Sequence, residues 1–440
     1  MASIVVVGGG VAGLTCAWRL RRAGHDVEVL ERAAEAGGRM RTESRGAFRL
    51  DRGASVVASS DANLHGVVQA LGLEPSLRPL ARAPSAVLRS GRLHTADLHS
   101  PLRLLTSDLL SASARARLPR LAFDLLRRAR RLDPLRPESA AVHDGESAAT
   151  ALRARVGDEA LDWLLAPGLA SALGADPERL SWGFGLLALR GLVSGLSPES
   201  FAGGGGLFTK RLAECLTLRR GCEVVQVETE TDGARVRFRA QGRARSVFAD
   251  AVVVALPGCD VARVCPKLTP SERGFFEQLR YARGMLVHLL FEAAPAVLPF
   301  SGVWFPRGEA GDLQSLDVAQ RRAGMAPPGA GLLCARLTEA AAEGLWEAPD
   351  AAVSDRVLGT LARTPIGRLA PFECAVQRIA PMHPQLPPGS LRRLAAFLGR
   401  IDRSPRLAFA GDYLVAPRVE GAVTSGMRAA TEVVQSLGSP

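Results

Sequence analysis

Three glycines near the start of the 440-residue chain have the spacing of a phosphate-binding turn. Gly8, Gly10 and Gly13 follow the β-branched run 4–7, which predicts a strand buried on both faces of a parallel sheet. In G-x-G-x-x-G the first glycine makes a tight turn, the second admits a pyrophosphate, and the third lets helix and strand pack closely. Val11 and Ala12 lie at the N-terminus of the expected helix, where unpaired N–H groups and the helix dipole favour phosphate.

A carboxylate follows the next expected strand at the distance that this motif requires. Residues 26–30 form that strand, and Glu31 and Arg32 come directly after it, about 20 residues beyond the glycines. A carboxylate here can accept hydrogen bonds from both ribose hydroxyls and would repel a 2′-phosphate. The pattern predicts an unphosphorylated adenine dinucleotide, either FAD or NAD; a solvated strand end is the alternative explanation of Glu31.

Further glycine-containing and acidic segments follow in order along the chain. They are Gly37-Gly38-Arg39, Asp51 with Gly53-Ala54-Ser55, Gly411-Asp412 at the end of an expected strand, and Glu420-Gly421-Ala422 at the start of the last helix. A turn or helix-capping aspartate is the alternative explanation of Asp412. The order of these segments resembles the flavin-containing amine oxidase superfamily, which includes monoamine oxidases, protoporphyrinogen oxidases and phytoene desaturases.

The resemblance implies FAD as the cofactor. In that superfamily the Gly-Gly-Arg segment lines the pyrophosphate and ribityl chain, the Gly-Asp aspartate binds the ribityl-phosphate region, and the Glu-Gly-Ala turn brings N–H groups to the flavin. A strand residue placed like Val224 holds the adenine. Because residues 415–418 contain no cysteine, the resemblance implies non-covalent FAD. The expected cofactor-binding residues are Gly8, Gly10, Val11, Ala12, Gly13, Glu31, Arg32, Gly37, Gly38, Arg39, Gly53, Ala54, Ser55, Val224, Gly411, Asp412, Glu420, Gly421 and Ala422.

The elements that must position these residues predict an α/β fold in which two domains alternate along the chain. We expect a Rossmann-type FAD-binding domain from residues 1–83, 206–265 and 398–440. An α+β substrate domain, with an antiparallel sheet plus helices, is expected from residues 84–205, which look largely helical, and from residues 266–397. Residues 381–384 are expected to break the chain before the next helix. The glycines at 203–206 either precede the return to the FAD domain or form a flexible linker.

The composition is that of a globular protein without a nucleic-acid or metal site. With 47% hydrophobic and 22% charged residues, the chain can bury a large core. The net charge of +11 comes almost wholly from arginine, since Lys210 and Lys267 are the only lysines, and the 5% of aromatic residues do not alternate with basic ones. Seven scattered cysteines without a C-x-x-C pair favour a reducing compartment, and with the isolated histidines they predict no bound metal.

One basic segment leaves membrane contact open. Residues 107–131 combine leucines and arginines at helical spacing, with a break or kink expected at Pro119. Such a segment is either the solvated face of a domain helix or an amphipathic helix on an anionic membrane surface. Because no run is long enough to span a bilayer and no leader precedes the first strand, we expect a cytoplasmic protein with at most peripheral membrane contact.

The sequence shows no catalytic triad and no pair of catalytic carboxylates, which is consistent with a flavin that takes the hydride while the protein positions and desolvates the substrate. Amine oxidases of the superfamily typically place an aromatic residue just before the Glu-Gly-Ala turn. Here Arg418 occupies that position, and a cation there would repel an ammonium and suit a carboxylate or a neutral substrate. Arg418 and Tyr413 are therefore the candidate catalytic residues, although Arg418 could instead pair with an acid and Tyr413 could be packing.

The resemblance implies an FAD-dependent oxidoreductase that takes a hydride from a C–C or C–N bond of a hydrophobic organic substrate. Because only one dinucleotide motif is present, electrons would leave to dioxygen or a quinone rather than arrive from NADPH. An oxidase of the protoporphyrinogen oxidase or desaturase type is favoured over an amine oxidase. A reduced-flavin isomerase or a non-catalytic flavoprotein is the alternative of another class, and the oligomeric state is not predicted.

Overall fold

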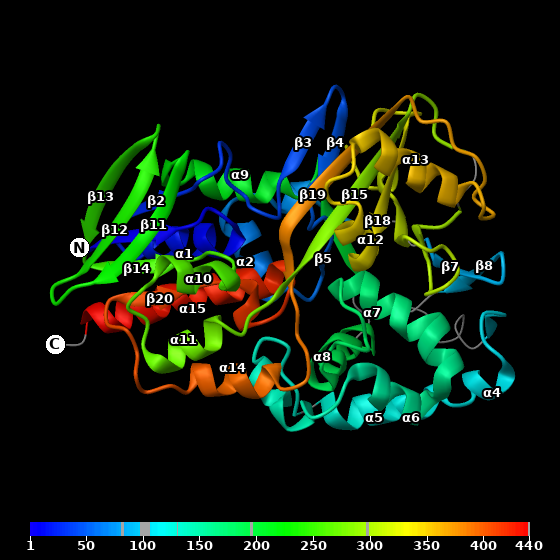
Figure 1. Cartoon of the computed structure of the whole chain (residues 1–440), viewed down its shortest axis with the longest axis horizontal. Coiled ribbons are helices and arrows are strands. Elements are labelled where there is room, and N and C mark those ends of the chain that lie inside the picture. Colours follow the sequence, from blue (N-terminus) through cyan, green and yellow to red (C-terminus); the bar gives the residue numbers. More distant parts are fainter. Residues whose placement is uncertain (81–82, 97–105, 130, 194–196, 296–298, 439–440) are drawn as a thin grey trace.

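The structure is a computed structural model that describes all residues except 81–82, 97–105, 130, 194–196, 296–298 and 439–440. A parallel sheet lies at the end of the molecule that holds both chain termini, and a mixed sheet lies toward the other end, above a cluster of helices (Figure 1). This is the predicted α/β architecture, a Rossmann-type domain and an α+β domain whose segments alternate along the chain. The exact domain boundaries stay a prediction.

Five parallel strands form the first sheet, in the order β10-β2-β1-β14-β20. They are β10 (Thr217–Arg219), β2 (Asp26–Leu30), β1 (Ser3–Val7), β14 (Ala251–Val254) and β20 (Leu407–Phe409). The central strands β1 and β14 are almost wholly buried because both faces of the sheet are covered. Helices α1 (Val11–Arg22) and α15 (Val419–Gly438) pack together on one face. The first and last segments of the chain therefore share one core.

The other face of this sheet is covered by an antiparallel sheet and three short helices. The strands are β11 (Cys222–Thr229), β12 (Ala234–Ala240) and β13 (Arg243–Ala249), and the helices are α10 (Gly258–Val264), α11 (Pro270–Phe276) and α14 (Ser390–Leu398). Phe276 lies 4.7 Å from Phe409 of β20 and 5.9 Å from Tyr413, measured between ring centroids. These rings belong to one apolar cluster that joins the helices to the parallel sheet.

The second large sheet has seven strands in the order β19-β15-β18-β17-β16-β7-β8. They are β19 (Glu373–Pro384), β15 (Tyr281–Phe291), β18 (Gly331–Leu337), β17 (Leu313–Val318), β16 (Gly302–Trp304), β7 (Ser85–Arg89) and β8 (Arg92–Ala96). All neighbours are antiparallel except β16 and β7. Helices α12 (Glu339–Gly344) and α13 (Asp350–Leu361) cover one face through a common apolar core. The opposite face is left to line a cavity.

Two details of the sequence expectations for this domain need correction. Residues 84–205 are largely helical, as expected, but they open with β7 and β8, a hairpin that completes the large sheet. Its turn, Ser90-Gly91, has positive φ at both positions, as a two-residue hairpin turn requires. Residues 381–384 do not break the chain but are the last residues of β19, where Tyr281 of β15 pairs with Pro384 after a register shift.

The helical cluster is built around the buried Trp182. It comprises α4 (Ala112–Arg115), α5 (Leu118–Ala129), α6 (Ala148–Ala160), α7 (Ala166–Leu173) and α8 (Trp182–Val193). The break expected at Pro119 is present: α4 ends at Arg115, and α5 begins at Leu118 with Pro119 in its first turn, where the missing N–H costs nothing. Arg130, part of the predicted basic segment, lies outside the described residues.

Smaller elements connect the two domains. They are the hairpin β3 (Thr42–Arg45) and β4 (Phe48–Asp51), the sheet of β5 (Val57–Ala58), β9 (Pro198–Phe201) and β6 (Leu77–Pro79), and the helices α2 (Ala62–Ala70) and α9 (Gly206–Glu214). Helix α9 begins directly after the predicted glycine turn. None of the described helices combines the length and hydrophobicity needed to cross a bilayer.

Candidate functional site

A cavity of about 870 Å³ is lined by the ends of the parallel strands and by the uncovered face of the seven-stranded sheet. The glycine turn after β1 lies at its wall, with Gly8, Gly10, Val11 and Ala12 among the lining residues. Gly8 has a φ of +106°, and a Cβ there would stand 2.7 Å from the carbonyl oxygen of Ala255. A Cβ on Gly13 would overlap the carbonyl oxygen of Gly8, so this glycine serves helix packing and does not line the cavity.

Glu31 and Arg32 line the cavity where β2 ends. The Glu31 carboxylate accepts hydrogen bonds from the backbone N–H of Gly9 at 2.7 Å and of Ala33 at 2.8 Å. Val224 and its neighbour Cys222 line the same end of the cavity from β11. The carboxylate is therefore held in place by the glycine turn itself, next to the strand that was predicted to hold an adenine.

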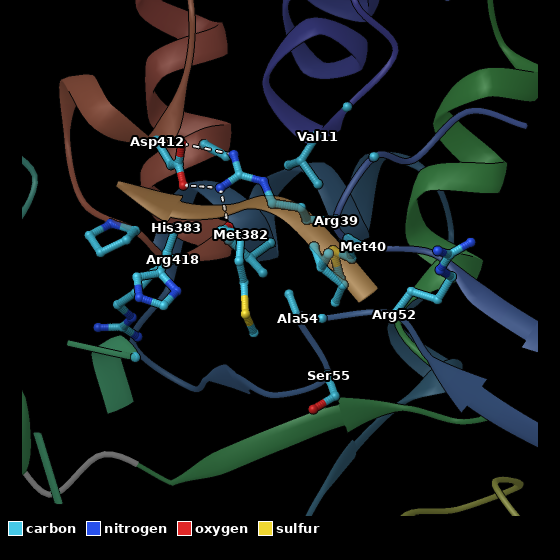
Figure 2. Close-up of a pocket in the computed structure, with 18 of the residues that line it drawn as sticks. Val11, Arg39, Met40, Arg52, Ala54, Ser55, Met382, His383, Asp412 and Arg418 are labelled. Atoms are coloured by element: carbon cyan, nitrogen blue, oxygen red, sulfur yellow. Dashed lines mark hydrogen bonds and ion pairs between the residues drawn. The ribbon is translucent and has the colours of Figure 1, made fainter. Parts of the chain in front are cut away.

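Arg39 forms a partly buried ion pair with Asp412, and its contacts join three distant segments (Figure 2). Its guanidinium donates to both oxygens of Asp412, at 2.9 and 3.0 Å, and to the carbonyl oxygen of Met382 at 2.7 Å. Burial lowers the pKa of Arg39, but Asp412, together with Tyr281 and Cys259, raises it, and the net shift is upward. Gly37, Gly38 and Gly411, all on the cavity wall, let these backbones approach: a Cβ on Gly38 would lie 3.3 Å from the Cα of Gly10.

Ser55 marks a polar part of the wall, where Gly53, Ala54 and Ser55 come together. Ser55 accepts a hydrogen bond from Arg322 at 2.8 Å, and a second nitrogen of Arg322 lies 4.0 Å from Asp51. Asp51 is nearly inaccessible and accepts hydrogen bonds from Thr42 and from the N–H of Gly205. Burial raises the pKa of Asp51 even though Arg322 and these hydrogen bonds lower it.

Arg418 and His383 lie at the same side of the cavity (Figure 2). Arg418 donates to Asp61 at 3.0 Å, so the arginine does pair with an acid, yet it remains part of the cavity wall together with Ala422. His383 sits against Gly174, and burial, followed by the charges of Arg336 and Arg39, lowers the pKa of its imidazole to about 4. A neutral imidazole is therefore expected there at neutral pH.

Three sequence-selected residues besides Gly13 do not line the cavity. Glu420 accepts hydrogen bonds from the N–H groups of Asn63 and Leu64 and thereby caps α2, and a Cβ on Gly421 would collide with the backbone of Ala416. Tyr413 is buried among Phe275 and Phe276, and its hydroxyl has no hydrogen-bond partner among the described residues. The packing explanation of Tyr413 is thus correct for its side chain, which does not reach the cavity.

Sequence reasoning missed several polar residues of the cavity wall, namely Asp317, Arg322, Arg336 and His383. One signal was available. Arg336 interrupts an apolar run that otherwise reads as a fully buried strand, and an arginine at such a position needs a polar surface or a ligand.

The residues present fit a bound dinucleotide. A Cβ on Gly10 would meet no protein atom within 4 Å, so this glycine leaves space in the cavity rather than serving the protein's own packing. Gly10 is the N-cap of α1, and the first turn carries no acidic side chain, which leaves its N–H groups to a phosphate. Glu31 would hold the ribose, and the cavity is at the upper end of the usual volume range for ligand sites.

Fold and site together define a dinucleotide-binding redox enzyme with a separate substrate sheet. Residues 11–434 match the model of the flavin containing amine oxidoreductase family, and the chain belongs to this family. It is an FAD-dependent oxidoreductase. When bound, FAD supplies a ring that accepts a hydride from an organic substrate.

Individual relatives differ in the substrates that they are named for. The chain is 27% identical over 468 residues to coproporphyrinogen III oxidase of Mycobacterium tuberculosis, covering 99% of this chain and 98% of the relative. It is 24% identical over 348 residues to mitochondrial protoporphyrinogen oxidase of Nicotiana tabacum, covering 68% of this chain and 67% of the relative. Cyclohexylamine oxidase from Brevibacterium oxydans has a similar structure, with a TM-score of 0.79, 19% identity and 100% of both chains covered, which shows the shared fold.

Proposed function

We propose that the protein oxidises a porphyrinogen, a hydrophobic ring of four pyrroles with carboxylate side chains. The observation that carries this proposal is the charge of the cavity where β16–β19 line it. Arg321, Arg322 and Arg336 come from the substrate sheet and its connections, and Arg418 adds a fourth cation beside the final helix. Of the carboxylates nearby on the wall, Asp61 is paired with Arg418 and Asp412 with Arg39, which leaves Asp317. Such a wall attracts an anionic substrate and repels an ammonium.

The relatives support the same choice, since the alignment with coproporphyrinogen III oxidase runs through nearly the whole chain. In each oxidation the ring would lose a hydride from a bridging carbon and a proton from a pyrrole nitrogen, which creates one new double bond. Bound FAD would supply the hydride acceptor, and we propose dioxygen as the final acceptor, which would take up the two electrons and two protons and leave as hydrogen peroxide. The protein's part is to hold the ring in a dry site next to the cofactor.

We further propose that FAD is held without a covalent bond, by the residues placed along the cavity wall. Among the described residues, the cysteine that lines the cavity is Cys222. It lies beside Glu31 and Val224, where an adenosine would bind, and Arg418 occupies the position before the final helix. Denaturation of the purified protein should therefore release the flavin into solution.

Amine oxidation is the second candidate, and Asp317 is the observation that favours it. This carboxylate lines the cavity and forms no ion pair or side-chain hydrogen bond with the described part of the chain, so it could bind an ammonium. Anaerobic mixing separates the two candidates. Loss of the visible flavin absorbance with coproporphyrinogen III or protoporphyrinogen IX, and not with cyclohexylamine or putrescine, is the expected result. Reduction by an amine alone would reverse the assignment.

We also propose that α5 lets the protein contact an anionic membrane surface. On its outer side Phe123 is 69% exposed and Leu126 is 57% exposed, and the side chain of Arg127, the next residue, is 68% exposed. Leu118, Leu121 and Leu125 on the inner side are buried in the helical cluster. Exposed apolar side chains next to arginine are typical of an interfacial helix. Co-sedimentation with vesicles containing anionic lipid, lost in Phe123→Ser/Leu126→Ser and absent with neutral vesicles, tests this contact.

A further inference from the structure

Arg336 is placed on the cavity face of the substrate sheet by the register of its strand. In β18 it pairs with Leu286 of β15 and lies beside Ser315 of β17, which also lines the cavity. Its neighbours Ala335 and Leu337 are buried in the apolar core on the other face. Because successive side chains of a strand alternate between faces, the guanidinium is directed toward the cavity.

Among the arginines of the wall that have no hydrogen-bond or ion-pair partner in the described part of the chain, Arg336 is the one whose Nε is buried. Neither a hydrogen bond nor an ion pair joins it to any described residue, and its Nε is buried without a hydrogen bond. Other lining arginines are held: Arg39 by Asp412, Arg418 by Asp61, Arg378 by Asp350, and Arg322 by Ser55. Withdrawing a guanidinium from water without an anion is unfavourable, so a complementary charge is expected from a ligand.

The groups around Arg336 leave its charge largely uncompensated. His383 is kept neutral by burial and by Arg336 and Arg39 themselves. Asp412 is engaged by Arg39, and Asp317 lies next to Cys334 rather than directly opposite Arg336. The cofactor's phosphates are expected at the glycine turn and the start of α1, which belong to the parallel sheet. Arg336 belongs to the substrate sheet, so we expect its anion to come from the substrate.

We propose that Arg336 is the site that binds a carboxylate of the substrate and thereby fixes how the ring lies in the cavity. A planar guanidinium matches a carboxylate with two parallel hydrogen bonds, which orients the substrate as well as binding it. The proposal rests on the proposed function, because it requires a substrate that carries carboxylates. Arg336 of β18 would then be the residue that selects a substrate by its negative charge.

The test compares a substrate with and without its negative charges. Arg336→Met, Arg336→Lys and a control, Arg283→Met, are assayed with coproporphyrinogen III and with its tetramethyl ester. Arg283 is on the same sheet, is exposed, pairs with Glu343 and does not line the cavity. Its replacement removes one positive charge, as Arg336→Met does, without changing the cavity wall. Arg336→Met should raise KM for the free acid about 10- to 100-fold, the factor of one charged hydrogen bond, with kcat little changed. The ester and the control should be unaffected, and Arg336→Lys should recover part of the loss.

Binding of the oxidised product supplies a readout that needs no turnover. Coproporphyrin III and its tetramethyl ester are titrated into each variant, followed by quenching of tryptophan fluorescence, because Trp304 lines the cavity. A preference for the free acid that disappears in Arg336→Met, in a protein that oxidises no porphyrinogen, would support the subsite while the proposed function fails. Equal losses for acid and ester, or a loss of bound FAD in Arg336→Met, would overturn the subsite while the oxidase activity of the wild type stands.

Discussion

The glycine turn allows a sharp prediction, because glycine-to-alanine substitution should impair FAD binding at one position of the motif and folding stability at another. In Gly10→Ala the added Cβ meets no protein atom within 4 Å, and the φ of −79° and ψ of 179° at this position suit alanine. In Gly13→Ala the added Cβ overlaps the carbonyl oxygen of Gly8 and stands 3.0 Å from the Cβ of Ala255. The first change fills the cavity, and the second forces α1 away from β1.

The two magnitudes follow from these contacts. Gly10→Ala should change the free energy of unfolding of the FAD-free protein by less than about 1 kcal/mol, the difference between glycine and alanine at an N-cap. It should weaken FAD binding by at least about tenfold, because the methyl group occupies space that a pyrophosphate must enter. Gly13→Ala should destabilise the FAD-free protein by about 3 kcal/mol, since both neighbours are rigid backbone or Cβ atoms that cannot rotate away.

The assay measures urea unfolding of the FAD-free protein and FAD binding by flavin fluorescence on the same three samples. We expect a wild-type-like unfolding midpoint with poor FAD binding for Gly10→Ala, and a lowered midpoint for Gly13→Ala. If Gly10→Ala binds FAD as tightly as the wild type, the phosphates do not approach the chain at this turn, and the placement of the dinucleotide along this cavity wall is refuted.

Three further results are expected. Arg39→Met should lower the urea midpoint of unfolding, because it leaves the buried Asp412 carboxylate unpaired at a cost of about 3 kcal/mol. Arg39→Met/Asp412→Asn should unfold at higher urea than Arg39→Met alone. The opposite order would show that the pair is not stabilising. Glu420→Ala should cost about 2 kcal/mol through the lost cap of α2 while FAD affinity changes less than in Gly10→Ala, as urea unfolding and FAD titration would show. The folded-state pKa of His383 is about 4, below its ordinary value, so the unfolded chain takes up the proton first and stability is lost as pH falls from about 6.5 toward 4. His383→Gln should reduce that loss by at most about 3 kcal/mol, measured from urea midpoints across this pH range. An unchanged pH profile would contradict a neutral buried imidazole.

The parts of the site that could be predicted are those that a short stretch of chain determines. The glycine turn, Glu31 and the Gly37–Arg39 segment lie within one β-α-β unit, so their spacing alone indicates a dinucleotide site. The buried strand 251–254 and the strand before Gly411 were recognisable because parallel strands are apolar on both faces. Even the missed hairpin of β7 and β8 carried a local signal in its Ser90-Gly91 turn.

The substrate end could not be predicted because it is assembled from distant positions. Ser55 and Arg322 are 267 residues apart in the chain, and Arg336 reaches the cavity only because β18 pairs between β15 and β17. No periodicity shows which strands will be neighbours in a mixed sheet. Tyr413 illustrates the reverse error, since its position after Asp412 suggested the flavin edge while its ring completes the aromatic cluster with Phe276.

The contacts of Arg39 explain how two domains with interleaved segments form one cavity. Its guanidinium binds Asp412, which follows the last strand of the parallel sheet, and the carbonyl oxygen of Met382, near the end of β19 in the substrate sheet. The loop that carries Arg39 is thus joined to two segments from different sheets at a single side chain on the cavity wall. Because Met382 and His383 are adjacent, the same ion pair also sets where the neutral imidazole stands relative to Arg336. The cofactor end and the substrate end of the cavity are therefore positioned together, so that a change at Arg39 should alter both.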